Sequence, residues 1–409
     1  MTGVPNICRQ TFAVLLFLIA VAATSSLALA AGAPLALDPS FGEAGVVSGG
    51  TARSDYREAA GLAIDGSGKI LVVGVSDSGA AIARYLPDGQ LDPTYGEGGI
   101  AALKSVPVTS GLSIEAVRGI NGLAVDGVGE ALVLWQGTKL TRFTSTGALD
   151  TSYGAGGTAT VAGFRFNALT TLANGSVLLA GYGYGSPYMV AAKLRPDGSL
   201  DDSFGKGGFA AVAIGPRETN AAARRVAVRG NGKIVLAGFS HGHPALVQLL
   251  ADGRPDPGFG HRGRVVAPGW LRGEATALGL AGGGRTLVSC RCSRSGSKST
   301  LLPLLRYTAA GRLDSSFSKP TLDHPVRQQL RPNFLLQSAG KIVLVGTGSG
   351  PSIRLFDGQG RPATSTPGAP RDRAFGVFAA LQGTKPLVAW TPEHRVGQAE
   401  LKIERFRLR

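Results

Sequence analysis

The sequence predicts an all-β fold, a seven-bladed β-propeller of four-stranded antiparallel blades, with the ring closed by an N-terminal strand that completes the last blade. Three observations lead to this prediction. An aspartate-aromatic-glycine segment recurs along the chain, an apolar strand-like element recurs with the same spacing, and each chain end holds part of one repeat. Glycine is abundant, with 61 of 409 residues, and charged residues make up 17%. Such a composition is typical of many short strands joined by turns.

The two recurring elements set the period. The first begins with residues 37–42 (LDPSFG) and returns every 51 to 58 residues, starting at Leu91, Leu149, Leu200, Pro255 and Leu313. The second is an apolar run that occurs seven times, at Lys69–Gly74, Glu130–Trp135, Ser176–Gly181, Lys233–Gly238, Arg285–Cys290, Lys341–Gly346 and Lys385–Trp390. A period of this length indicates a repeat architecture in which one supersecondary unit is copied.

Each unit reads as four strands. In the first complete unit, Asp65-Gly66 and Pro87-Asp88-Gly89 supply the sharp turns that antiparallel neighbours need. Four antiparallel strands per repeat are typical of a propeller blade. The expected strands are residues 60–64, 69–74, 80–85 and 99–103.

The chain ends complement one another. The last unit stops after its third strand, Leu401–Leu408, and the segment Leu37–Val47 is a fourth strand without a blade of its own. Pairing these two would close the ring and remove the free sheet edges. An open solenoid of seven sheets is the alternative, but it leaves this complementarity unexplained.

At these residues the chain resembles the bacterial delta-60 repeat family, whose unit carries a PDG turn, an L-D-x-S-F-G-x-x-G segment and a GKI-like strand. The resemblance covers residues 37 to 409 and implies a propeller-like domain, in a family whose function is largely unassigned. The last two units depart from the pattern. Ser318 replaces a glycine, and residues 361–364 (RPAT) replace the aspartate segment.

The first 30 residues are typical of an export signal. Arg9 precedes an uncharged apolar stretch, residues 12–23, which is too short to span a bilayer. A small-residue cleavage motif ends at Ala30. We therefore expect a signal peptide at 1–30 and a single propeller domain at 31–409. The expected product is a monomer that does not span the membrane and is secreted, either to the exterior or to the cell envelope.

The formal net charge is +15, which favours anionic partners such as acidic polysaccharides. A compositional drift toward arginine explains the charge equally well. No cofactor and no specific nucleic-acid partner are expected.

Cys290 and Cys292 are the two cysteines beyond the signal segment. They are expected either to form a local disulfide or to remain two buried thiols. Side chains two apart on an extended strand have Cα atoms near the upper limit for a disulfide, so a bridge would require the strand to have ended.

The recurring aspartates are predicted to be structural. An aspartate followed by Ser or Thr and then an aromatic residue can accept backbone N–H groups across a turn, with the aromatic ring filling the space between blades. The most asymmetric motif is His241-Gly242-His243. A metal site formed by His241 and His243, with His261 as a third ligand, is the less favoured interpretation of this motif. The sequence therefore predicts neither a metal ligand nor a catalytic residue.

Function is expected on the face that carries the second-to-third-strand loops and the blade connections, because these segments vary between units. Their basic and aromatic residues suit stacking on sugars and pairing with anions, although exposed loops are commonly polar in any case. The candidate binding residues are Tyr182, Tyr184, Tyr188, His241, His243, Trp270, Arg272, Arg291, Arg294 and Lys298.

Three functions are compatible with the sequence. The first is a noncatalytic binding or interaction module for an anionic polysaccharide or a protein. The second is a propeller-scaffold enzyme of the lyase, lactonase or glycosidase type, which would need an asymmetric acid, base or metal cluster at the central channel. The third is a purely structural envelope protein.

Overall fold

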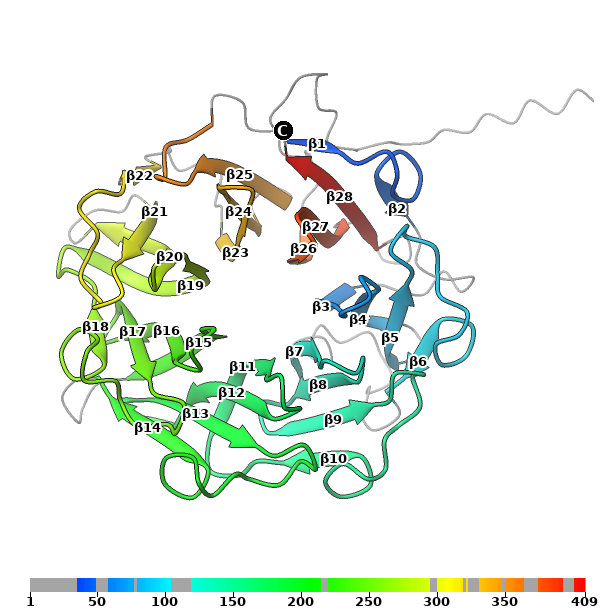
Figure 1. Cartoon of the computed structure of the whole chain (residues 1–409), viewed down its shortest axis with the longest axis horizontal. Helices are drawn as coiled ribbons and strands as arrows, with labels where there is room; N and C mark the ends of the chain where they lie inside the picture. The colour runs from blue at the N-terminus through cyan, green and yellow to red at the C-terminus, as the bar shows by residue number, and fades with distance from the viewer. Residues whose placement is uncertain are drawn as a thin grey trace, which may run out of the picture.

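The computed structural model describes residues 35–48, 58–76, 79–103, 119–214, 220–294, 300–318, 321–322, 331–347, 351–363, 374–392 and 401–408. Its regular elements are the strands β1 to β28, arranged as seven antiparallel blades around a central axis (Figure 1). The predicted seven-bladed β-propeller is therefore confirmed. The predicted signal peptide at 1–30 lies outside the described residues.

The blades follow one another in chain order. Blade 1 comprises β3 (Glu58–Ile64), β4 (Ile70–Ser76), β5 (Gly79–Tyr85) and β6 (Ile100–Ala102), and blade 2 comprises β7 (Ile120–Val125), β8 (Ala131–Trp135), β9 (Lys139–Phe143) and β10 (Thr158–Thr160). Blade 3 comprises β11 (Arg165–Thr171), β12 (Val177–Tyr182), β13 (Tyr188–Leu194) and β14 (Phe209–Ala213), and blade 4 comprises β15 (Ala221–Val228), β16 (Ile234–Ser240), β17 (His243–Leu249) and β18 (Arg264–Val266). Blade 5 comprises β19 (Leu271–Ala281), β20 (Arg285–Arg294), β21 (Thr300–Tyr307) and β22 (Thr321–Leu322), and the described part of blade 6 comprises β23 (Arg331–Ser338), β24 (Lys341–Thr347) and β25 (Pro351–Asp357).

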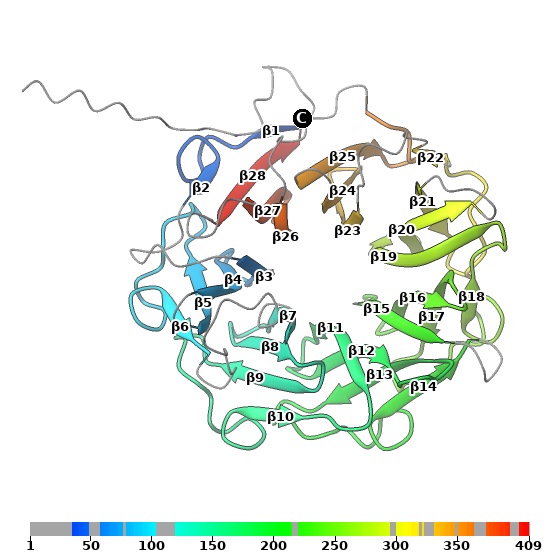
Figure 2. The same cartoon turned by 180° about the vertical axis from the view of Figure 1, so that it is seen from behind.

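Blade 7 joins the two ends of the chain. Its strands β26 (Ala374–Gln382), β27 (Lys385–Pro392) and β28 (Lys402–Leu408) come from the C-terminus, and β1 (Leu35–Leu37) and β2 (Val46–Ser48) both pair with β28. Leu37 lies opposite Phe406, and Val46 lies opposite Glu404. The blue and red ends of the chain meet in this blade (Figure 2). The predicted closure by an N-terminal strand is confirmed.

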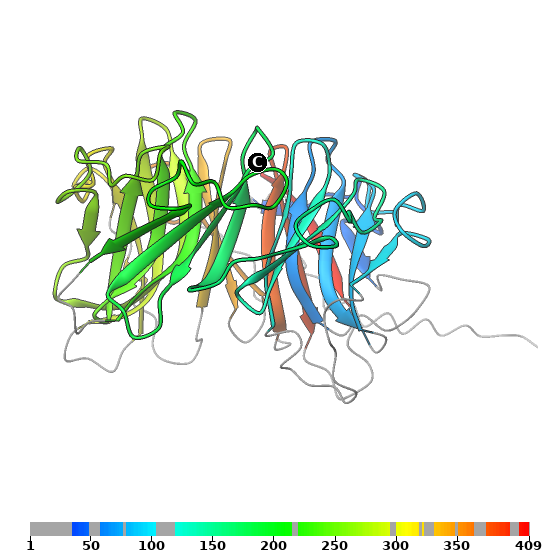
Figure 3. The same cartoon turned by 90° about the horizontal axis from the view of Figure 1, so that it is seen from below.

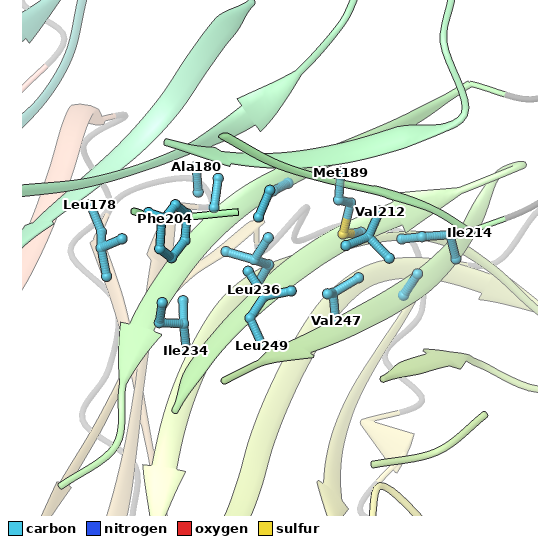
Figure 4. Packing of buried hydrophobic residues seen from close by; sticks show 14 residues of the cluster. Leu178, Ala180, Met189, Phe204, Val212, Ile214, Ile234, Leu236, Val247 and Leu249 are labelled. Carbon is cyan, nitrogen blue, oxygen red and sulfur yellow. The ribbon is translucent and has the colours of Figure 1, made fainter. Parts of the chain in front are cut away.

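The hydrophobic core lies between the blades. The first strand of each blade is nearest the channel, and the later strands lie progressively outward (Figure 1). Between blades 3 and 4, for example, Leu178 and Met189 pack with Leu236 and Val247 (Figure 4). Because each blade buries one face against each neighbour, the strands read as nearly continuous apolar runs, which explains the recurring KIVLVG-like element.

The two faces of the ring differ as expected from strand order. Short turns lie along one rim (Figure 3), and Gln382 Nε2 at the first turn of blade 7 donates to both tight turns of blade 1, to Gly68 O at 2.6 Å and to Pro87 O at 3.2 Å. We call this side the tight-turn face. On the other side, Gly273 N–H donates to Gly242 O at 2.7 Å, so a second-to-third-strand loop meets the start of the next blade. We call that side the variable face.

The recurring aspartate segment forms a connection that we call the blade latch. In blade 1, Asp92 Oδ1 accepts hydrogen bonds from Thr94 N at 3.1 Å and Thr94 Oγ1 at 2.6 Å, and Tyr95 is fully buried. This is the predicted structural role. The latch also contains a cation that the sequence did not point out, since Arg84 Nε lies 2.9 Å from Asp92 Oδ2 and the guanidinium stacks on Tyr95 at 4.3 Å.

The latch recurs around the ring with the same chemistry. Each of the six aspartates has a lysine or arginine partner; in chain order the pairs are Asp38–Arg405, Asp92–Arg84, Asp150–Arg142, Asp201–Lys193, Asp256–Lys233 and Asp314–Arg306.

Each latch also holds the next blade. Gly96 N–H donates to Thr146 O of blade 2 at 2.7 Å, and Arg84 donates to Ser145 O of the same turn. Gly147, at φ 84°, packs so closely that a Cβ atom there would lie 2.7 Å from Gly96 N. Only glycine tolerates both this φ and this approach, which explains why the turn glycine recurs.

The ionised aspartates contribute to stability. Burial of Asp38 and Asp92 opposes ionisation, but hydrogen bonds from Lys385 and Ser40 to Asp38, and from Thr94 and Lys69 to Asp92, outweigh it and hold the pKa of each carboxyl well below its usual range. A depressed carboxyl pKa contributes stability that is present above the unfolded-state pKa and is lost as the pH falls through the folded-state value.

Deleting residues 37–47 should lower the melting temperature by roughly 10 °C or more, because it removes half of the residue pairs between the N-terminal strands and β28, together with the Asp38–Arg405 ion pair. Replacing residues 37–47 by a copy of residues 91–101, the equivalent segment of blade 1, should restore most of that loss. Calorimetry of the three proteins measures both effects. A deletion variant that melts like the parent would contradict closure by these strands.

Acidification should reduce stability steeply below about pH 4, the ordinary range of an aspartate pKa. Asp92→Asn should cost about 3 kcal/mol at pH 7, because Arg84 is then left buried without its carboxylate. The difference in unfolding free energy between the variant and the parent should become smaller as the pH falls below 3. Urea titrations at pH 7, 4 and 2 measure it, and a difference that does not depend on pH would exclude an ionised latch.

Candidate binding surface

Blades 3, 4 and 5 form one continuous strip on the variable face. Ala221 N–H donates to Ser186 O at 3.1 Å, His241 N–H donates to Asn220 O at 3.0 Å, and Gly273 N–H donates to Gly242 O at 2.7 Å. The first and third of these bonds join consecutive blades, and the second joins the β16–β17 loop to the residue before β15 within blade 4. We call the strip the blade 3–5 surface, and it comprises residues 182–188, 220–225, 240–243, 270–274 and Arg291.

The blade 3 end of this surface is aromatic. Tyr184 is 72% exposed and packs edge-on against Tyr182, with ring centroids 5.7 Å apart. Arg165 lies over the Tyr184 ring at 5.8 Å, and Tyr188 is exposed at the start of β13. The structure thus brings Tyr182 and Tyr184 together, places Tyr188 at the start of the next strand, and adds Arg165, which the sequence did not single out.

His241 and His243 lie in the middle of the surface, at the loop between β16 and β17. His241 is exposed at φ 51°, whereas His243 Nδ1 hydrogen-bonds to Leu271 O at 2.8 Å. His261 lies in the latch segment of blade 4, on the tight-turn face. The three histidines therefore do not converge, and within the described ranges no group of three His, Cys, Asp or Glu side chains could hold a metal ion.

The blade 5 end is rich in arginine. Glu274 forms ion pairs with two arginines. Its Oε2 lies 3.1 Å from Arg224 Nε, and its Oε1 lies 3.9 Å from Arg291 Nη2. Arg272 is exposed nearby in β19, next to Trp270, which is 44% exposed. One carboxylate thus pairs with two arginines, and exposed Arg272 adds a third cation two residues away on β19, so this end of the surface carries excess positive charge.

Two of the predicted basic residues lie in a strand, whereas the sequence predicted both in a variable loop. Arg291 and Arg294 belong to β20 and not to a loop, because β20 extends to Arg294 and pairs with β19 along its whole length. The side chain of Arg294 and all of Lys298 lie outside the described residues.

Cys290 and Cys292 form a disulfide inside β20. The expectation that a bridge would require the strand to end is wrong. The Cα atoms lie 5.4 Å apart, less than the roughly 6.6 Å of two extended residues, so β20 is locally shortened and not terminated. The pairing of β20 with β21 is interrupted between Ser289 and Cys292, and the neighbouring strand carries a proline there, at position 303, which has no N–H to donate. The bridge brackets Arg291, whose side chain is exposed.

Sequence reasoning missed Arg225. It lies at a bulge of β15, in the innermost strand of blade 4. Its guanidinium donates to Asn333 O of blade 6, at 3.3 Å from Nη2, and lies over the Phe334 ring at 5.6 Å. Burial lowers the pKa of Arg225 to about 10, which leaves it cationic at neutral pH. A signal was available, because four other repeats place a small residue here: Gly61, Gly122, Ala168 and Ala277.

The comparisons with known proteins agree with the fold. The family model described as "Domain of unknown function (DUF5122) beta-propeller" matches residues 66–95, 172–204 and 229–259, which lie in blades 1, 3 and 4. The chain is therefore a β-propeller repeat protein. A search of the curated proteins finds no match.

Three solved structures of low sequence identity match the chain, and two of them, with TM-scores above 0.5, share its fold. The polysaccharide lyase Uly1 is 11% identical, with 84% of this chain and 89% of that chain covered and a TM-score of 0.54. The WD40 β-propeller domain of Doa1 is 11% identical, with coverages of 89% and 96% and a TM-score of 0.52. The computationally designed protein Ika8 is 12% identical, with coverages of 82% and 81% and a TM-score of 0.42. At these identities the likeness concerns the fold alone.

No helix among the described residues is long and apolar enough to cross a membrane.

Proposed function

We propose that this protein is a secreted, noncatalytic binding module that engages an anionic glycopolymer through the blade 3–5 surface. The observation that supports this most is the cluster at its blade 5 end, where Arg224 and Arg291 share the single carboxylate of Glu274. A binding surface for a neutral ligand would have no need of this excess of positive charge.

The chemistry of the surface fits such a polymer. Arginine pairs with carboxylate and sulfate groups through two parallel hydrogen bonds. Exposed Trp270 and Tyr184 offer flat rings on which the apolar face of a sugar can stack. The strip spans three blades, so charged and aromatic contacts can engage successive sugar units of one chain.

We further propose that the chain is a member of the delta-60 repeat family. The family model matches three stretches, and the L-D-x-S/T-F/Y-G segment recurs outside them, at residues 37–42 and 149–154. Cleavage after Ala30 would export the propeller and place it where cell-surface polymers are encountered.

Binding without catalysis is favoured over a lyase or glycosidase by the character of the groups. Such enzymes need a positioned acid and base. Among the described residues of the blade 3–5 surface the carboxylate is Glu274, which is held by arginine, and His243 is engaged with a backbone carbonyl. Incubation with polygalacturonate, followed by ultraviolet absorbance of unsaturated ends, would reveal a lyase directly.

The purified protein should bind dextran sulfate and polygalacturonate at low salt and release them at high salt, and it should not bind uncharged dextran. The double variant Arg272→Gln with Arg291→Gln should weaken binding by about tenfold or more, which corresponds to about 1.4 kcal/mol. Trp270→Ala should weaken it by several-fold at any salt concentration, because stacking is not screened. Calorimetric titration measures all three.

The matched control is Lys206→Gln, which removes an exposed cation from the tight-turn face. It should bind like the parent. Equal losses in this variant and in the arginine variant would mean that net charge, and not the blade 3–5 surface, determines binding, and the proposal would fail.

A further inference from the structure

The junction between blades 5 and 6 holds a cavity of about 460 Å³ on the tight-turn face. Its lining includes Ala281, Arg285 and Arg306 from blade 5, and Gln337 and Lys341 from blade 6. It lies on the opposite side of the ring from the blade 3–5 surface, so it is a separate feature of the molecule.

The cavity exists because Ala281 is small. The equivalent residue, at the end of the first strand, bridges to the next blade in three other units. Ser338 donates to Thr384 O at 2.6 Å. Gln382 donates to Gly68 O at 2.6 Å, and Arg229 donates to Thr286 Oγ1 at 2.6 Å. The methyl group of Ala281 cannot span that distance, and the space beside it stays open.

Lys341 faces this space without the partner that its counterparts have. Lys69, Lys233 and Lys385 each lie 2.6 to 3.0 Å from the latch aspartate of their own blade. In blade 6 the aspartate position is occupied by Ala363, whose N–H makes the latch hydrogen bond to Leu355 O at 2.9 Å. Within the described residues, Lys341 has no carboxylate partner.

The remaining groups add further donors. Arg306 and Arg285 share one carboxylate, Asp314, at 2.8 Å and 3.5 Å. Lys341, Arg285 and Arg306 therefore line the cavity, and Asp314 is the carboxylate that makes ion pairs with them within the described residues. Asp357 lies opposite Lys341 in the strand pairing, without an ion pair to it. Gln337 Nε2 is buried and makes no hydrogen bond within the described residues, and the corresponding residues of blades 1 and 7, Ile64 and Leu381, are apolar.

We propose that this cavity binds a small organic dianion, a polar molecule that carries two carboxylates. One carboxylate pairs with Lys341 and the amide of Gln337, and the other with Arg285 of blade 5, since charge-assisted hydrogen bonds to carboxylates are the strong ones. Arg306 contributes positive charge only, because its guanidinium already donates to Asp314, Gly358 O, Ser316 and Gln359. The volume falls within the range of small-molecule sites, about 300–1,000 Å³. An inorganic ion would leave most of it unfilled.

The test uses three compounds with the same six-carbon polyol skeleton: glucarate with two carboxylates, gluconate with one and glucitol with none. At constant ionic strength, titration calorimetry should show glucarate binding about tenfold tighter than gluconate, and glucitol should not bind. Lys341→Met should weaken glucarate binding by about tenfold. Ala281→Gln should abolish it, because the longer side chain fills the cavity as Gln382 fills the equivalent space in blade 7.

Lys206→Met is the control for loss of a cation on the same face, and it should bind glucarate like the parent. Melting curves confirm that each variant is folded, and Ala281→Gln should melt at or above the parent temperature. The proposal is overturned if glucarate does not bind, if glucitol binds equally well, or if folded Ala281→Gln retains the parent affinity.

Discussion

The ion pair between each latch aspartate and its lysine or arginine is the interaction on which the ring depends. The aspartate fixes its own turn through N–H and O–H donors, and the cation neutralises it where it is almost buried. In blades 1, 2, 5 and 7 the same guanidinium also donates to the turn of the following blade. Intrablade geometry and interblade packing are thus set by one group of residues, and removing one member leaves a buried charge without a partner.

Confining this connection to one face leaves the other face free to vary. The tight-turn face repeats because each turn glycine must pack against the preceding latch. The loops of the variable face carry no such requirement, and there the repeat accommodates Trp270 and the arginines around Glu274. Where the latch itself is altered, at Ala363 in blade 6 and beside Ala281 in blade 5, the tight-turn face also gains an individual feature, the cavity between those blades.

The fold could be predicted from the sequence because the latch segment and the apolar strands are local features that recur in each unit. Their spacing predicted the repeat period, the number of strands per blade and the closure of the ring by residues 37–47. The cation partners were missed, because Arg84 and Asp92 are eight positions apart and meet only once β5 has turned back. Arg225 was missed because its role depends on Asn333, a residue two blades away. The disulfide setting was misjudged, because local shortening of β20 is not encoded in the spacing of two cysteines.

The most direct test of the proposed function is hydrogen–deuterium exchange of the full protein with and without dextran sulfate. Exchange should slow at three backbone amides of the blade 3–5 surface, those of Ala221, His241 and Gly273, and should not change at the latch amides of the opposite face. Protection of the tight-turn face, or uniform protection around the ring, would contradict the proposed function.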